Sequence, residues 1–285
     1  MQQSHQSGAF SSLSGLAFMS EATYWTLDRA AEWHMRHISP KALPCHAAAF
    51  RSEIIDGKNA IDKRMLYMAS VQNKEGKHIC GGFLISEDLV VTAAHCDPHN
   101  PTSVVLGTHN LKKVDDKTMR YTVKRCKNPS YEKVSSGNDI MLLKLTKKAR
   151  LSKRVQPIKL PKPNKKKVLK KCQVAGWGRT STRGKTVDAL HVVDVSLIDL
   201  DTCKKEWKSI NVKLPDNIIC AGGYNTSKGF CRGDSGGPLV CSGEVVGVVS
   251  FNMRENCDYP NVPNIYTDIS KYLELIKDVR NKKTC

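Results

Sequence analysis

The chain has 285 residues, of which 40% are hydrophobic and 25% charged, and its formal net charge at pH 7 is +18. This composition is typical of a globular protein with a sizeable core, and it excludes collagen-like and low-complexity chains. No apolar stretch is long enough to span a membrane, so we expect no transmembrane segment.

Short runs rich in β-branched residues, separated by turn residues, recur along the chain. We expect strands at residues 82–85, 89–92, 103–106, 140–145, 192–197 and 244–250. The only amphipathic helix expected is at residues 269–279, which end in a basic turn. Many short strands with one terminal helix favour an all-β fold.

Residues 1–51 show no strong pattern of either kind. No apolar run of about 7–15 residues follows a basic start, so we recognise no signal peptide there. We expect this segment to be disordered, and we hypothesise that it comes from an alternative or wrongly predicted first exon.

The chain contains eleven cysteines and no CxxC pair. Cysteines in this number and without metal-ligand spacing indicate disulfide bonds formed in an oxidising compartment.

A glycine-rich run at residues 233–238, with the sequence GDSGGP, is the strongest candidate for a reactive site. A serine nucleophile needs its hydroxyl exposed at a tight turn and nearby N–H groups that are free to hold an oxyanion. Flanking glycines allow both. We therefore take Ser235 as a candidate nucleophile.

Candidate partners of this serine lie upstream. The strand expected at residues 89–92 runs into a turn of small residues that presents His95, and Asp139 directly precedes an apolar strand. The chain order His, Asp, Ser is one of several orders that give a hydrolytic triad.

From Ile54 to about Arg280 the chain resembles the chymotrypsin-like serine proteases. The resemblance is carried by five segments in order: IIDG at 54–57, TAAHC at 92–96, DIML at 139–142, GWG at 176–178 and GDSGGP at 233–238. It implies an all-β fold of two six-stranded antiparallel Greek-key β-barrels, with the active site in the cleft between them and a C-terminal α-helix. The barrels are expected at about 66–152 and 168–268, and the helix at about 269–280.

The resemblance also implies a role for each matching residue. Ser235 would attack the scissile carbonyl, His95 would act as general base and Asp139 would orient the histidine. The backbone N–H groups of Gly233 and Ser235 would form the oxyanion hole, and the Ser250 hydroxyl would support Asp139. No cofactor is implied.

In this family, cleavage before the Ile-Ile start frees an α-ammonium group that pairs with the Asp preceding the nucleophile. Here the pair would be Ile54 and Asp234. The residue before Ile54 is Glu53 rather than Lys or Arg, so a trypsin-like activator is not expected to cut this bond. The pair Ser52-Glu53 resembles the acidic dipeptide that a dipeptidyl peptidase removes from granzymes and their mast-cell relatives.

The predicted substrate pocket departs from trypsin-like relatives, because Gly229 replaces the Asp that selects Arg or Lys. Phe230 follows, and Asn252 and Asn264 align with the pocket walls, while two arginines lie near the rim. The expected pocket residues are Gly229, Phe230, Arg232, Ser250, Phe251, Asn252 and Asn264, with Arg254 nearby. We predict a narrowed, uncharged pocket that favours small to medium uncharged side chains.

The family's bridges, carried over residue by residue, are Cys80–Cys96, Cys172–Cys241, Cys203–Cys220 and Cys231–Cys257. Cys45, Cys126 and Cys285 are left over. The sequence leaves open a Cys126–Cys285 bridge, a bridge to a second subunit and a buried thiol. The protein is accordingly a monomer or a disulfide-linked dimer.

The first 53 residues carry equal numbers of basic and acidic side chains, so the whole charge excess belongs to the protease-like part. This excess, concentrated in lysine-rich runs between residues 147 and 171, favours binding of a polyanion such as a sulfated proteoglycan rather than sequence-specific nucleic acid. Protein substrates and serpin-type inhibitors are the other expected partners, in a secreted or granule setting. Asn225 begins a glycosylation sequon, and no metal site is expected.

Two functions remain as alternatives at this point. The first is a granzyme-like serine endopeptidase. The second is a weak or silent homologue that acts as a basic heparin-binding or antimicrobial protein.

Overall fold

The computed structural model describes residues 54–61, 63–162, 171–259, 261–281 and 285. Residues 1–51, the dipeptide 52–53 and residues 163–170, which belong to the lysine-rich runs, lie outside the described residues. Everything below therefore concerns the protease-like part of the chain.

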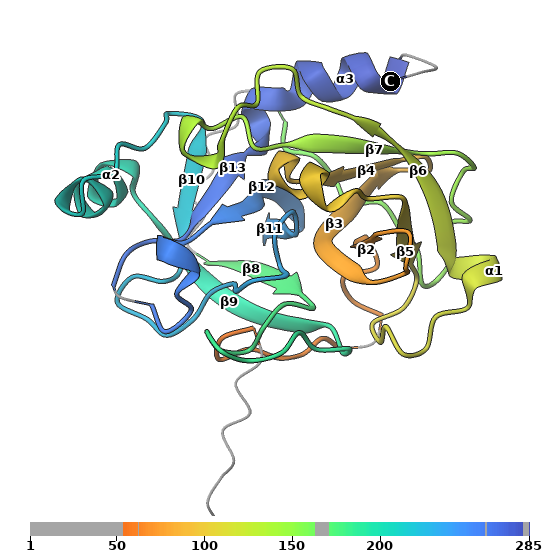
Figure 1. Ribbon diagram of the computed structural model, residues 1–285, viewed down its shortest axis with the longest axis horizontal. Helices are drawn as coiled ribbons and strands as arrows, with labels where there is room; N and C mark the ends of the chain where they lie inside the picture. Colours follow the sequence, from red (N-terminus) through yellow and green to blue (C-terminus); the bar gives the residue numbers. More distant parts are fainter. Residues whose placement is uncertain (1–53, 62, 163–170, 260, 282–284) are drawn as a thin grey trace, which may run out of the picture. The chain divides into compact units, whose positions relative to one another are not determined.

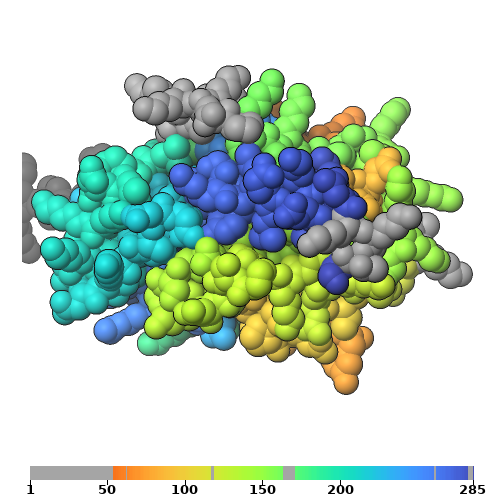
Figure 2. All heavy atoms as spheres, turned by 90° about the horizontal axis from the view of Figure 1, so that it is seen from above, coloured from red at the N-terminus to blue at the C-terminus, as the bar shows by residue number. Residues whose placement is uncertain are grey.

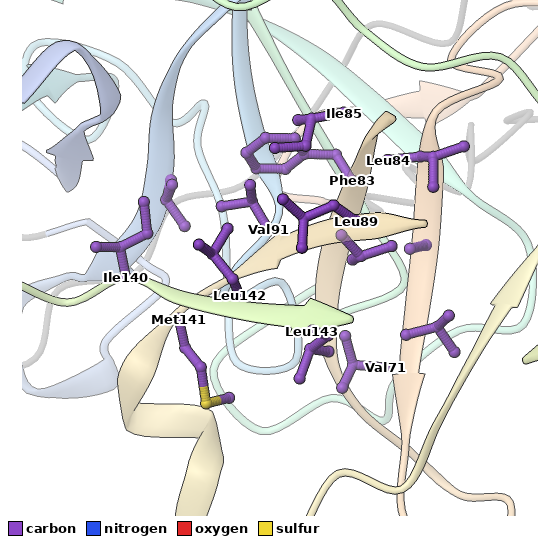
Figure 3. Close-up of a cluster of buried hydrophobic side chains, with 14 of the residues drawn as sticks. Val71, Phe83, Leu84, Ile85, Leu89, Val91, Ile140, Met141, Leu142 and Leu143 are labelled. Atoms are coloured by element: carbon purple, nitrogen blue, oxygen red, sulfur yellow. The ribbon is translucent and has the colours of Figure 1, made fainter. Parts of the chain in front are cut away.

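The first half of this part forms a closed antiparallel barrel (Figure 1). Its strands are β2 (Met68–Gln72), β3 (His78–Ser86), β4 (Leu89–Thr92), β5 (Ser103–Leu106), β6 (Arg120–Cys126) and β7 (Met141–Leu145), paired in the order β2-β3-β4-β7-β6-β5. Inward-facing aliphatic and aromatic side chains fill the barrel, as Figure 3 shows for Phe83, Val91 and Leu142. None of these three exposes any surface, so this barrel has a dry core.

The second half forms another six-stranded barrel. Its strands are β8 (Lys171–Gly176), β9 (His191–Ile198), β10 (Ile218–Ala221), β11 (Pro238–Cys241), β12 (Glu244–Phe251) and β13 (Ile265–Asp268), and pairing of β11 and β9 with β8 closes the ring. A short strand β1 (Lys58–Asn59) pairs with β9 outside the ring. Two closed six-stranded barrels confirm the predicted fold class.

The expectation of a single helix was wrong. Besides the C-terminal helix there is α2 (Leu200–Ser209), and a short α1 (Asp116–Met119) precedes β6. Asp199 caps α2 by accepting a hydrogen bond from Thr202 N at 2.8 Å, and Cys203 and Trp207, four residues apart, bury the same face. The polar composition of α2 hides this narrow apolar stripe in the sequence.

The predicted C-terminal helix is present and begins with one tighter turn. Ile269–Tyr272 form a 3₁₀ turn that continues into α3 (Leu273–Asn281). Figures 1 and 2 both show α3 lying beside the yellow-green chain of β6 and β7, and Lys144 Nζ lies 3.5 Å from Val279 O. The terminal helix thus packs on the first barrel. No helix in the described part of the chain is long and apolar enough to cross a membrane.

Five disulfide bonds close the structure. The four bridges implied by the resemblance are all formed, namely Cys80–Cys96, Cys172–Cys241, Cys203–Cys220 and Cys231–Cys257. A fifth joins Cys126 at the end of β6 to Cys285. This bridge is one of the alternatives that the sequence allowed for these cysteines. It ties the C-terminus to the first barrel across a separation of 159 residues.

Candidate active site

His95 and Asp139 meet through two hydrogen bonds. His95 lies in the 3₁₀ turn Ala94–His99 that follows β4, and Asp139 follows Asn138, whose φ of 60° turns the chain just before β7. His95 Nδ1 is 2.7 Å from Asp139 Oδ2, and His95 N donates to Asp139 Oδ1 at 2.9 Å. The carboxylate therefore fixes both the ring and the backbone of the histidine.

The Asp139 carboxylate stays ionised although none of its side chain is exposed. Burial raises the pKa of Asp139, but the hydrogen bonds and charge of His95, together with Ser250, outweigh this and hold the pKa below its ordinary value. Ser250 Oγ donates to Asp139 Oδ2 at 2.5 Å, and Thr267 Oγ1 donates to Asp139 O at 3.0 Å. Both of these donors come from the second barrel.

Ser235 occupies a turn that both barrels hold in place. Its carbonyl accepts from Gly81 N at 2.8 Å in the first barrel, and Gly236 N donates to Val249 O at 2.9 Å in the second. Gly236 has a φ of +81°, and a Cβ there would collide with Thr92 Oγ1. Only glycine fits this position, which explains the residue that follows the serine.

The residues beside Ser235 provide free backbone donors. Within the described residues, neither Gly233 N nor Ser235 N donates to an acceptor. The carbonyl of Gly233 accepts from His78 Nε2 at 3.0 Å, so the other ring nitrogen, Nδ1, accepts from Ser70 Oγ at 2.8 Å. Burial lowers the pKa of His78 to about 4, which keeps this ring neutral.

The sequence analysis missed His78 and Ser70. No motif marks them, because His78 contacts a residue 155 positions away that only the docking of the two barrels brings near.

Asp234 is a fully buried carboxylate held by backbone groups. Gly178 N donates to its Oδ1 at 2.7 Å and Cys231 N to its Oδ2 at 2.9 Å. A Cβ on Gly178 would lie within 2.6 Å of this carboxylate, so a larger residue there would exclude the Asp234 side chain. The Gly-Trp-Gly segment therefore forms the cradle of this carboxylate. Burial raises the pKa of Asp234 to about 7.

The predicted pairing of Ile54 with Asp234 is not formed in this chain. Nothing in the described residues joins the two, and Ile54 N is here a peptide nitrogen bonded to residue 53. The Ile54 side chain is fully buried in the core cluster of the second barrel, which includes Phe230 and Tyr266. The pairing therefore stays a prediction for the cleaved chain.

His95 and Ser235 line the same cleft, which has a volume of about 420 Å³. Its apolar lining comes from α2, the segment after α2 and β12, with Trp207, Val212 and Phe251 as the main residues. The rim is charged, and Arg232 pairs there with Glu255 at 3.0 Å. The charge that Arg232 would bring to the cleft is thus offset.

The expected pocket residues divide into two groups. Phe230, Arg232, Ser250, Phe251 and Asn252 line the cleft, together with Arg254, whereas Gly229 and Asn264 do not.

The space beneath the cleft is filled by side chains that the sequence analysis did not consider. A Cβ on Gly229 would collide with the Asn264 amide and with Tyr259, whose hydroxyl donates to Phe230 O at 2.7 Å. The buried Phe230 ring meets Tyr266 edge to face, with 5.2 Å between ring centres. The pocket is therefore shallow and carries no charged group at its base.

Two further predictions concern sites outside the cleft. Asn225 lies on an exposed loop, where its backbone N donates to Asn261 Oδ1 at 2.7 Å. Among the residues with defined placement, no group of three or more His, Cys, Asp or Glu side chains could hold a metal ion.

Comparison with known proteins agrees with this geometry. The profile of the Trypsin family matches residues 54–276. Mouse granzyme B(G,H) is 39% identical over 230 residues, which cover 79% of this chain and 90% of the mouse protein. Bovine duodenase-1 is 40% identical over 228 residues, covering 79% and 88%. Mouse neuropsin, described as a serine protease, superposes with a TM-score of 0.70 at 30% identity and covers 79% of this chain and 99% of its own.

Proposed function

The chain belongs to the trypsin family of serine endopeptidases and is related to the granzymes, and from this premise we propose that Ser235, His95 and Asp139 are its catalytic triad. The observation that carries the proposal is the double hydrogen bond between His95 and the buried, ionised Asp139, beside Ser235 in one cleft.

In this proposal each residue of the triad has a step in peptide-bond hydrolysis. Ser235 Oγ attacks the scissile carbonyl while His95 accepts its proton, and His95 then returns that proton to the leaving amine. Asp139 holds the tautomer with the proton on Nδ1 and stabilises the imidazolium ion. Water then hydrolyses the acyl-enzyme by the same base.

Gly233 N and Ser235 N stabilise the developing oxyanion. Their lack of other acceptors supports this assignment, as does the His78 hydrogen bond that fixes the Gly233 carbonyl. Losing one such donor costs about 10²–10³-fold in turnover in a comparable site.

The enzyme is made as a zymogen that is activated by release of Ile54. The new α-ammonium group pairs with Asp234, which otherwise has only two backbone donors in a buried site. A buried carboxylate without a counter-charge is costly, so the cleaved form gains a stabilising interaction next to the nucleophile. The removed dipeptide is Ser52-Glu53.

The substrate preference is for small to medium uncharged side chains at the cleaved bond. The side chains packed beneath Phe230 leave little depth, and the pairing with Glu255 offsets the charge of Arg232, one of the two arginines that line the cleft. The apolar lining favours apolar residues further upstream in the substrate.

The enzyme acts on protein substrates in a secreted or granule setting and binds sulfated proteoglycan through its net positive charge. Stronger retention on a heparin column than a neutral homologue at matched salt is the expected behaviour. Serpin-type inhibitors and use of the Asn225 sequon fit the same setting.

A second candidate function is a weak or silent homologue that acts as a basic heparin-binding protein. It is favoured by the shallow pocket together with the net charge of +18.

Fluorophosphonate labelling separates the two functions. The processed protein should label at Ser235, and Ser235→Ala should not label. A positional-scanning peptide library then tests the substrate preference. Failure of the processed protein to label would overturn the catalytic proposal, and a preference for Arg or Lys would overturn the proposed pocket.

A further inference from the structure

A second cavity of about 560 Å³ lies away from the catalytic cleft and shares no lining residue with it. Five chain segments line it: residues 59–60, 63 and 66 before β2, residues 107–110 and 113 after β5, Met119 at the end of α1, the loop at 153–154, and residues 189–190 before β9. In Figure 1 the first of these segments runs beneath β9, with which β1 pairs. Its volume lies within the range of about 300–1,000 Å³ that is usual for ligand pockets.

Cationic and apolar side chains both line the cavity. Four exposed cationic side chains line it, from Lys63, Lys113, Lys153 and Arg154, and among the described residues no Asp or Glu does. Leu66, Met119 and Leu190 supply the apolar surface.

These four cations have no carboxylate partner within the described residues. The neighbouring carboxylates are engaged elsewhere: Asp188 pairs with Lys112 at 2.9 Å and Asp116 with Arg120 at 2.8 Å. A concave site lined by charges of one sign concentrates the opposite ion. The cavity therefore attracts anions.

Hydrogen bonds fix the walls of the cavity in place. His109 O accepts from Leu190 N at 2.6 Å and from Trp177 Nε1 at 3.2 Å, and Ala60 N donates to Leu190 O at 2.8 Å. The loop at residues 107–113 is further fixed by a bridge between Asn110 and Ala189. Because the walls are preformed, a ligand need not order them on binding.

We propose that this cavity binds a compact polyol that carries several sulfate or phosphate esters. The ester oxyanions pair with Lys63, Lys113, Lys153 and Arg154, while the carbon skeleton rests on the apolar surface. Arg154 donates two hydrogen bonds to ester oxygens in a fork, and the lysines act as point charges. This site is more specific than the surface attraction proposed above for proteoglycan, and it does not depend on catalysis.

The test compares two variants with the same loss of charge. The first replaces the four lining cations with Gln (Lys63→Gln, Lys113→Gln, Lys153→Gln, Arg154→Gln). The second replaces four surface lysines outside the cavity (Lys205→Gln, Lys208→Gln, Lys213→Gln, Lys271→Gln). Calorimetric titration of the full chain and both variants with myo-inositol hexasulfate and hexakisphosphate at about 0.15 M salt gives the dissociation constants.

The first variant should weaken binding by at least about tenfold, and the second by less than about threefold. Equal losses in the two variants would show that only net charge matters, and this result, or no binding to the parent chain, would overturn the proposal. The hexasulfate and hexakisphosphate arms show which ester is preferred. Fluorophosphonate labelling of the processed forms of all three proteins monitors the fold of the catalytic site separately, so an inactive enzyme with an intact anion site would still be recognised.

Discussion

The buried carboxylate of Asp234 should make the stability of the uncleaved chain fall as pH rises. Burial raises the pKa of Asp234 from its ordinary value of 3.8 to about 7. Because the folded chain holds this proton more tightly than the unfolded chain, the stabilisation is complete below about pH 4 and is lost as pH rises to about 7. At about 1.4 kcal/mol per tenfold change in proton affinity, the loss is of the order of 4 kcal/mol.

About 2–3 kcal/mol of this loss falls between pH 5 and pH 7.5. Urea unfolding of the full chain at several pH values measures it. Asp234→Asn cannot titrate, so subtracting its pH profile from that of the parent isolates this one group. The processed chain, with a free Ile54 ammonium, should show little of the effect, because the ion pair lowers the pKa of Asp234.

The reasoning would be refuted by parallel pH profiles for the full chain and Asp234→Asn. If the processed chain loses as much stability over this pH range as the uncleaved chain, the proposed ion pair between the Ile54 ammonium and Asp234 would be refuted.

Three further predictions concern single side chains. Ser250→Ala removes a donor to Asp139, so kcat/KM should fall about tenfold. The acidic limb of the pH profile of kcat/KM should shift to higher pH. A variant with parental kinetics would contradict the role of this hydroxyl. Glu255→Gln frees Arg232 on the rim, so a peptide library should show a severalfold gain for acidic side chains, and an unchanged profile would place Arg232 outside substrate contact. Cys285→Ser opens the Cys126 bridge and should lower the free energy of unfolding by about 2–4 kcal/mol, which denaturant melts would measure, with no change in labelling of Ser235.

Sequence patterns located six of the twelve barrel strands; β2, β6, β8, β10, β11 and β13 were not expected. All six expected strands are present, and the edges of the run at residues 89–92 agree with β4. The pattern did not show β6, because its side chains are partly or fully exposed and only Cys126 is buried. That strand forms because its neighbours β5 and β7 supply hydrogen-bond partners on both sides.

The same limit applies to the site. His95, Asp139 and Ser235 stand in short motifs, so the sequence identifies them as candidates. Tyr259 and His78 stand in none. Their contacts with Phe230 and Gly233 depend on how distant segments pack, which local periodicity does not encode.

The two barrels hold each other's catalytic residues. His95 and Asp139 come from the first barrel. The two side-chain hydroxyl groups that donate to Asp139 come from the second barrel and belong to Ser250 and Thr267. Ser235 comes from the second barrel, yet its carbonyl is fixed by Gly81 N in the first.

This exchange means that the active geometry exists only when the barrels are docked. Separate folding of either barrel would leave its catalytic residue without the partners that orient it, and a shift of about 1 Å at the interface would disturb nucleophile and base together. Asp234 adds to this coupling, because its cradle at Gly178 lies in the second barrel while His78 of the first holds the adjacent Gly233 carbonyl. In the proposed activation, cleavage before Ile54 therefore acts where the proposed oxyanion donors are positioned, so that a single new charge would control the site.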